Sequence, residues 1–250
     1  MRQQLFFEKR GVWRIELSTF RQYAGWHDKV NRCQYEAPSD PWRLVEIPPE
    51  EVTYFASELR LNYGMGRVQG GDWDRGGSHR RMRESTLYRS LEQYFLNDVP
   101  WEETGLYERA AQQIKTTGQF RGYEILDAFR QVRCEYIDDL YRSISETGYR
   151  PNAAAGHEQA TDNAFESTYA NHLEPLVLVG RDGDIFLTEG SHRFTIASLL
   201  ELESIPVNVL CRHVEWQQIR DRIAVASGDT FPEDLDAYHG HPDLSDITSC

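Results

Sequence analysis

The stretch EPLVLVGRDGDIFLTEGSHRFTIASLLELESIPVNVL (residues 174–210) carries the clearest structural pattern in the chain. Two short apolar runs, at 174–180 and 184–189, flank an Asp-Gly pair, which is typical of the turn in a β-hairpin. Residues 191–203 predict a helix, and IPVNVLC (205–211) is again rich in β-branched residues. The stretch therefore predicts strand, turn, strand, helix and strand in that order.

The sequence as a whole divides into three regions by its pattern of apolar residues and glycines. Residues 1–122 predict a mostly helical N-terminal extension with a glycine-rich loop at 64–78. Residues 123–214 predict a module of strands and helices, and residues 215–250 predict one helix and an acidic tail. The predicted fold class is therefore α+β, with a small mixed sheet. The sequence also predicts a strand at 42–47 and helices at 50–61, 84–97, 102–116, 134–149 and 215–227.

The composition is that of a strongly acidic protein. The 250 residues carry a net charge of -13, and only three of the 27 basic residues are lysine. Because carboxylates keep a surface hydrated at high salt, we expect a halophilic protein, with an ordinary acidic bacterial protein as the alternative. The acidity disfavours a broad DNA-binding surface, although HRRMR (79–83) forms a local basic patch.

Several common classes of protein lack support in the sequence. There is no run of eighteen apolar residues and no apolar signal-peptide core at the start, so we expect a cytoplasmic protein without membrane spans. Cys33, Cys134, Cys211 and Cys250 are widely spaced, which favours structural thiols over a zinc or redox pair. P-loop, nucleophile-elbow, H-E-x-x-H and dinucleotide-binding motifs are absent.

The tetrapeptide Gly190-Ser191-His192-Arg193 stands between the second predicted strand and the predicted helix. A helix N-terminus presents N–H groups and a partial positive charge, and both favour anions. Gly190 permits close approach of a ligand, Ser191 suits the N-cap position, and Arg193 offers a forked guanidinium for phosphate. Glu189 is a candidate general base, a metal ligand or a partner for Arg193. The alternative is an ordinary strand-to-helix turn.

Several motifs surround this turn in a fixed order. They are L-x-x-S-I-x-x-x-G at 140–148, E-P-L-V-L-V at 174–179, Asp-Gly at 182–183, G-x-x-R at 190–193 and I-P-V at 205–207. In this order the chain resembles the ParB/sulfiredoxin-like superfamily over about residues 135–211. The insertion between Gly148 and Glu174 is longer than that pattern usually shows. The resemblance implies a small α/β fold that binds a nucleotide, with its phosphates on the G-x-x-R turn.

The resemblance also narrows the chemistry. Partition proteins of this superfamily bind and hydrolyse CTP. Sulfiredoxin carries a Cys at the position where this chain has Ser191, so the resemblance does not imply thiol chemistry. TEGSHR (188–193) is similar to the turn of a branch of free-amino-acid kinases. The implied ligands are therefore CTP, ATP or ADP with Mg²⁺, and phosphate is hydrolysed or transferred to a small hydroxyl-bearing substrate. Gly190, Ser191, His192 and Arg193 would bind phosphate, and Glu189 and His192 would be catalytic.

Other interpretations remain open on the same residues. The aromatic and arginine-rich N-terminal half suits a non-catalytic module that binds a partner protein or nucleic acid. A ParB-like nuclease would need a carboxylate cluster for a metal, which the sequence does not identify. The second copy of Gly-Ser-His-Arg, at 77–80, lacks a preceding strand; we expect a solvated connection there, with a lid over the first copy as the alternative. The two histidines of YHGHPDL (238–244) are a weak candidate for a metal pair.

Overall fold

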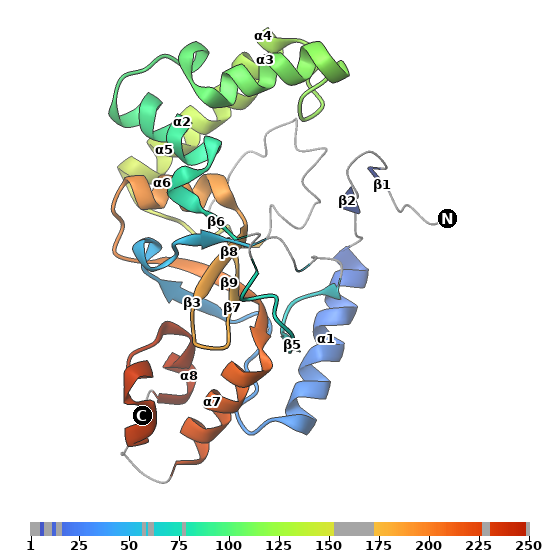
Figure 1. The fold of residues 1–250 in the computed structure, drawn as a ribbon, viewed down its shortest axis with the longest axis vertical. Helices are drawn as coiled ribbons and strands as arrows, with labels where there is room; N and C mark the ends of the chain where they lie inside the picture. Colours follow the sequence, from blue (N-terminus) through green and yellow to red (C-terminus); the bar gives the residue numbers. More distant parts are fainter. Residues whose placement is uncertain are drawn as a thin grey trace.

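The chain folds around one seven-stranded mixed sheet with helices on both faces, as the computed structural model in Figure 1 shows. The structure describes residues 6–7, 12–13, 17–56, 59, 63–76, 79–152, 173–226 and 231–248. Over these residues it confirms the predicted α+β class. The strands lie in the order β3 (Leu44–Ile47), β9 (Ile205–His213), β7 (Leu176–Val179), β8 (Ile185–Glu189), β4 (Tyr54–Phe55) and β6 (Arg80–Arg81); β5 (Arg67–Gln69) also pairs with β9, and β1 (Phe6–Phe7) and β2 (Val12–Trp13) form a separate pair.

The central hairpin forms where the sequence predicts it. β7 and β8 pair antiparallel, α6 (Ser191–Leu199) follows β8, and β9 then runs parallel to β7. Successive side chains of a strand point to opposite faces of the sheet. Leu176 and Leu178 accordingly join one core cluster, while Val177 and Val179 join the other. β7 is therefore buried on both faces, which explains its unbroken apolar sequence.

Four strands of this sheet come from the N-terminal region. β3 lies within the strand predicted at 42–47 and pairs antiparallel with β9. The helix predicted at 50–61 is wrong over its described part, because Pro49–Glu51 form a short 3-10 turn and β4 pairs in parallel with β8. Tyr54 and Phe55 pair with Phe186 and Leu187, more than a hundred residues later in the chain. The local sequence around Tyr54 therefore gives no signal for this strand. Strands from both sides of the predicted boundary at 122 thus share one sheet.

Helices cover the two faces of the sheet. α1 (Leu17–Gln34) places Phe20 against one face. On the other face, α6 contributes Phe194, and α7 (Val214–Val225) contributes Trp216. All three aromatic side chains are at most 1% exposed, so the sheet is sealed between two apolar layers.

A further helical layer packs on α6 (Figure 1). Its apolar core, which is rich in aromatic residues, includes Ile196 and Leu199 of α6. α6 therefore joins this layer to the sheet. The last helix of the layer contains a π-helical segment, a local widening that is frequent at functional sites. The helices predicted at 84–97, 102–116 and 134–149 are confirmed as α2 (Thr86–Leu96), α3 (Gly105–Thr117) and α5 (Glu135–Thr147); α5 continues from α4 (Leu126–Ala128) through the π segment (Phe129–Cys134).

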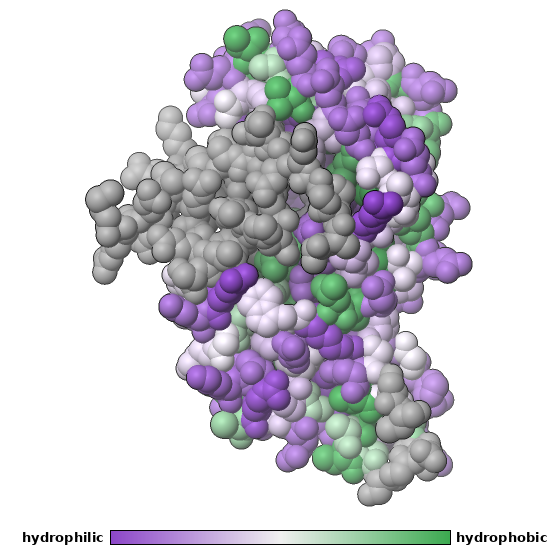
Figure 2. Space-filling model, turned by 180° about the vertical axis from the view of Figure 1, so that it is seen from behind, coloured by the Kyte–Doolittle hydropathy of each residue, from purple (hydrophilic) through white to green (hydrophobic). Residues whose placement is uncertain are grey.

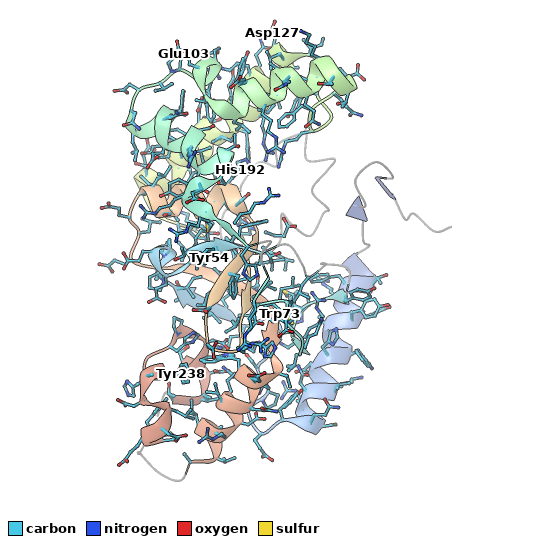
Figure 3. The ribbon with its side chains drawn as sticks, viewed as in Figure 1. Tyr54, Trp73, Glu103, Asp127, His192 and Tyr238 are labelled. Atoms are coloured by element: carbon cyan, nitrogen blue, oxygen red, sulfur yellow. The ribbon has the colours of Figure 1, made fainter. Side chains whose placement is uncertain are left out.

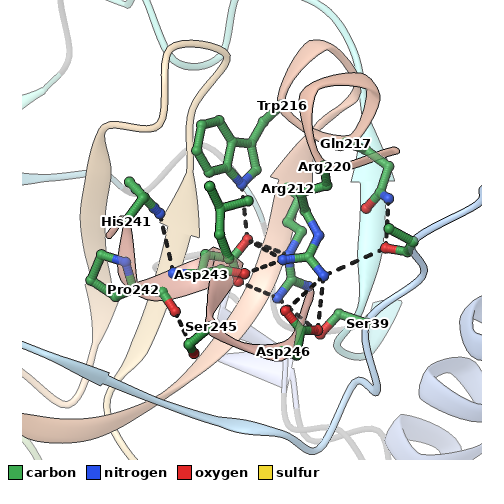
Figure 4. Close-up of polar contacts among 12 residues, drawn as sticks. Ser39, Arg212, Trp216, Gln217, Arg220, His241, Pro242, Asp243, Ser245 and Asp246 are labelled. Atoms are coloured by element: carbon green, nitrogen blue, oxygen red, sulfur yellow. Dashed lines mark hydrogen bonds and ion pairs between the residues drawn. The ribbon is translucent and has the colours of Figure 1, made fainter. Parts of the chain in front are cut away.

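The C-terminal segment is attached by a buried ion network, shown in Figure 4. Asp243 is fully buried and accepts hydrogen bonds from Arg212, at 2.6 and 2.8 Å, and from the indole of Trp216 at 2.9 Å. Arg220, also fully buried, bonds to the carbonyl of Asp243. In its described part, the predicted acidic tail forms short helices, η7 (Glu233–Tyr238), η8 (Pro242–Leu244) and α8 (Ser245–Thr248).

The described surface is mainly hydrophilic. Figure 2 shows the side opposite to Figure 1, where hydrophobic side chains are scattered among polar ones. The mean hydropathy of -0.63 agrees with this view. Among the described residues, no helix combines the length and the apolar character needed to cross a membrane.

Candidate functional site

The turn between β8 and α6 depends on Gly190. This residue is the N-cap of α6 and has a φ of 81°, in the left-handed region that favours glycine. A Cβ at Gly190 would lie 2.8 Å from Cα of Pro175, the residue that precedes β7. Ser191 is therefore the first helical residue and not the N-cap that the sequence predicted. The backbone of the turn passes too close to Pro175 for any side chain at position 190.

His192 lies in the first turn of α6, beside the neighbouring helical layer (Figure 3). Both of its ring nitrogens are 3.4 Å from Nη2 of Arg133, so the guanidinium lies against the imidazole. Arg133 belongs to the π-helical segment and is 3% exposed. A second arginine, Arg121, acts on the same imidazole from the turn that joins Phe120 and Tyr123. Two neighbouring segments of the helical layer thus bring Arg121 and Arg133 to the N-terminus of α6.

The electrostatics of this cluster are visible in the pKa of His192. Burial lowers this pKa well below its ordinary value of 6.5, and the positive charges of Arg133 and then Arg121 lower it further. The imidazole is therefore neutral at pH 7. A neutral imidazole retains one nitrogen that accepts a proton or a hydrogen bond, while the arginines and the helix N-terminus supply the positive potential.

Arg193 points to a different partner. Its guanidinium bonds to Oε2 of Glu174 at 3.1 Å and to the carbonyl oxygen of Leu173 at 2.7 Å. Glu174 is 5% exposed and also accepts hydrogen bonds from the Tyr149 hydroxyl, at 2.7 Å, and from the backbone N–H of Asn152. Arg193 therefore neutralises a buried carboxylate beside β7, and its predicted phosphate contact stays a prediction.

Glu189 ends β8 and is exposed, directly before the turn. Its predicted catalytic or magnesium-binding role stays a prediction. The described residues hold no group of three or more His, Cys, Asp or Glu side chains that could bind a metal ion. His241 is one of the two histidines considered as a weak candidate for a metal pair. Its Nε2 lies 2.9 Å from the carbonyl oxygen of Gly183, and its ring packs against the ring of Trp216.

The glycine-rich loop lies at the other end of β8. Arg181, in the hairpin turn that precedes β8, donates hydrogen bonds to both carboxylate oxygens of Asp74 at 2.7 and 2.9 Å. Burial acts to raise the pKa of Asp74, but the bonds from Arg181 outweigh it and lower this pKa to about 2. Gly190 follows the opposite end of the same strand, so this part of the loop does not cover the turn. In the second tetrapeptide, His79 packs on Phe186, and residues 77–78 lie outside the described residues.

Sequence reasoning missed Arg121 and Arg133. Both lie outside the motifs around the turn, and their approach to His192 depends on how the helical layer packs on α6. The π-helical segment that carries Arg133 has no sequence signature of its own. One signal was present in the sequence: Arg133 stands four residues after Phe129 and four before Ile137, so helical spacing places an arginine on an apolar face, where it needs a polar partner.

Comparison with known proteins adds no family to this description. No protein-family model, no curated protein and no solved structure matches the chain. The resemblance to ParB/sulfiredoxin-like proteins therefore stays a prediction from the residues at 140–148 and 174–207.

Proposed function

We propose that the chain binds a nucleotide, CTP, ATP or ADP, through its phosphates at the N-terminus of α6. The observation that carries this proposal is the contact of Arg133 with His192 in the first helical turn, with Arg121 acting on the same ring. Two arginines, a neutral imidazole and a helix N-terminus form an environment that favours a polyanion. Mg²⁺ would enter with the phosphates, and Glu189, which directly precedes the turn, is the carboxylate proposed to bind it.

A chemical step is proposed on the same site. His192, which is neutral, and Glu189, which is exposed, are the candidate acid–base groups for transfer of phosphate to water or to a small hydroxyl-bearing substrate. Arg121 and Arg133 would stabilise the charge on the transferred group. The alternative of a non-catalytic module requires only the binding step.

The binding proposal is tested by titrating CTP, ATP and ADP, each with Mg²⁺, into the protein at high salt. Arg121→Asn suits the left-handed backbone at that position, where φ is 52°, and removes one charge from the site. We expect the affinity of the best nucleotide to fall at least about tenfold, because a hydrogen bond to a charged group contributes roughly 1.5–3 kcal/mol. Arg142→Gln, on the exposed side of α5, is the matched control and leaves the affinity unchanged.

Two outcomes would contradict the proposal: no nucleotide binds the unmodified protein, or Arg121→Asn and Arg142→Gln bind equally well. Phosphate release or transfer, measured with the nucleotide that binds best, then separates the two functional alternatives. Turnover by the unmodified protein that falls in Glu189→Gln favours the enzyme. Binding without any turnover in the unmodified protein favours the non-catalytic module.

A further inference from the structure

A groove of about 510 Å³ runs between the end of α2 and α5, on the helical layer. None of its lining residues takes part in the candidate nucleotide site. Aromatic side chains form its wall, and exposed polar residues of α5 and of the loop after α2 form its rim. Its volume is within the range of pockets that bind ligands in proteins, about 300–1,000 Å³.

The aromatic wall is a fixed surface. The rings of Phe95 and Tyr141 stack with centroids 3.8 Å apart and an interplanar angle of 5°. Tyr94 stacks on the fully buried Trp101, with centroids 4.4 Å apart. These contacts hold the rings in place without a ligand, so little order has to be gained when a ligand binds.

The charge of the groove is negative. Asp98, Asp138 and Glu146 line it, and Arg142 is the one basic residue among its described lining residues. Arg142 is paired with Asp139 at 2.9 Å and so is already neutralised in part. Asp138 accepts hydrogen bonds from the indole of Trp101, at 2.9 Å, and from the hydroxyl of Tyr94, at 3.3 Å, and lies 3.9 Å from the guanidinium of Arg130. The negative charge of the groove therefore rests mainly on Asp98 and Glu146.

We propose that this groove is the docking site for an arginine-bearing segment of a partner polypeptide. Aromatic faces attract a flat cation, and neighbouring carboxylates accept the forked N–H groups of a guanidinium. Charge complementarity therefore selects a basic occupant, and the combination of ring faces and carboxylates selects arginine over lysine, whose ammonium is compact and strongly hydrated. Asp98 and Glu146 are exposed and receive the side chain from solvent.

The test uses three short capped peptides that differ only in carrying arginine, lysine or citrulline between glycines. Citrulline has the shape of arginine without its charge. Binding is measured by titration at an ionic strength of about 0.15 M, where nonspecific attraction is largely screened. We expect the arginine peptide to bind, the lysine peptide to bind more weakly and the citrulline peptide not to bind.

A double variant, Asp98→Asn with Glu146→Gln, removes two exposed charges from the rim and leaves the aromatic wall in place. We expect it to weaken the arginine peptide about tenfold or more, as loss of complementary charge does at interfaces. The matched control, Glu108→Gln with Asp127→Asn, removes two charges elsewhere on the same helical layer and leaves the affinity unchanged. Equal weakening by both double variants would show general attraction to an acidic protein and would overturn the proposal. Equal affinity for lysine, or no binding of the arginine peptide, would also overturn it.

Discussion

Gly190 shows how one backbone position determines the geometry of the candidate site. From the sequence, we expected that Gly190 lets a ligand approach the backbone. The structure shows instead that the backbone of another segment, at Pro175, lies close to Gly190. The two explanations agree on the residue and differ on the cause. The role of Arg193 has the same ambiguity, since a sequence shows that an arginine follows the turn but not which carboxylate or phosphate it meets.

Gly190→Ala is expected to destabilise the protein by more than its backbone conformation alone requires. A left-handed conformation costs a residue with a Cβ roughly 1–2 kcal/mol, and contact with Pro175 adds to this. Gly118→Ala is a matched control, because Gly118 has the same φ of 81° and a Cβ at that position would meet no atom within 4 Å. The difference between the two variants in urea unfolding measures the contact with Pro175. Equal destabilisation would show that the turn tolerates a side chain.

At the scale of single elements, sequence pattern was reliable for most local elements, although it missed the helix α1 (Leu17–Gln34). α2, α3, α5 and the hairpin of β7 and β8 follow from apolar periodicity and turn residues. β4, β6 and β5, which lies within the loop predicted at 64–78, were missed because each has only two or three residues and exists through its neighbours in the sheet. The π-helical segment was missed for a related reason: its hydrogen-bond pattern is decided by packing, and it is this segment that carries Arg133.

The attachment of the C-terminal helices to α7 gives a prediction at this scale. Asp243→Asn removes the carboxylate that bonds to Arg212 and contacts Arg220, both of which are at most 3% exposed. Breaking a buried pair from one side typically costs about 3–5 kcal/mol, because the remaining charge stays buried. We expect the free energy of unfolding, measured in urea, to fall by this amount. We also expect faster amide hydrogen exchange in residues 242–248 than in the unmodified protein.

Asp234→Asn is the control for that measurement. Asp234 pairs with Arg222 at 2.6 Å, but both side chains are more than half exposed. Exposed ion pairs contribute about 0–1 kcal/mol, so this variant is expected to unfold almost as the unmodified protein does. A similar small effect for Asp243→Asn would show that the network is not what holds the segment.

For the whole molecule, partly buried histidines predict how stability depends on pH. Burial lowers the pKa values of His27, His192 and His241 below 6.5. The unfolded chain therefore binds more protons than the folded protein once the pH falls below about 6.5. The free energy of unfolding then decreases with falling pH, by up to about 1.4 kcal/mol per pH unit for each histidine, until the folded-state pKa is reached.

This dependence is measured by urea unfolding at several values between about pH 7.5 and 5.5, above the ordinary range of carboxylates. The unmodified protein is expected to lose stability across this interval, and His192→Asn to lose less, since its position no longer takes up a proton on unfolding. Parallel curves for the two proteins would show that His192 is not shielded from protonation in the folded state.

The largest gap between sequence and structure is the path of the chain through the sheet. The predicted boundary at residue 122 follows a change of composition, and composition does not show that β3 and β5, before the boundary, pair with β9, after it. The core clusters likewise combine residues from both ends of the chain, such as Val45 and Leu244. Pairings of this kind leave no local periodicity. The sequence alone therefore predicted the fold class but not which strands make up the sheet.

The position of β9 also affects how the chain is made. β9 is the shared partner of β3, β5 and β7, and Ile47 pairs with Ile205. At a synthesis rate of about 5–20 residues per second, β3 leaves the ribosome roughly 10–30 s before its partner exists. During that interval its edge is open to pairing with other nascent chains. The sheet is therefore completed only after most of the chain has been made, and pairings between strands so far apart in sequence favour slow folding.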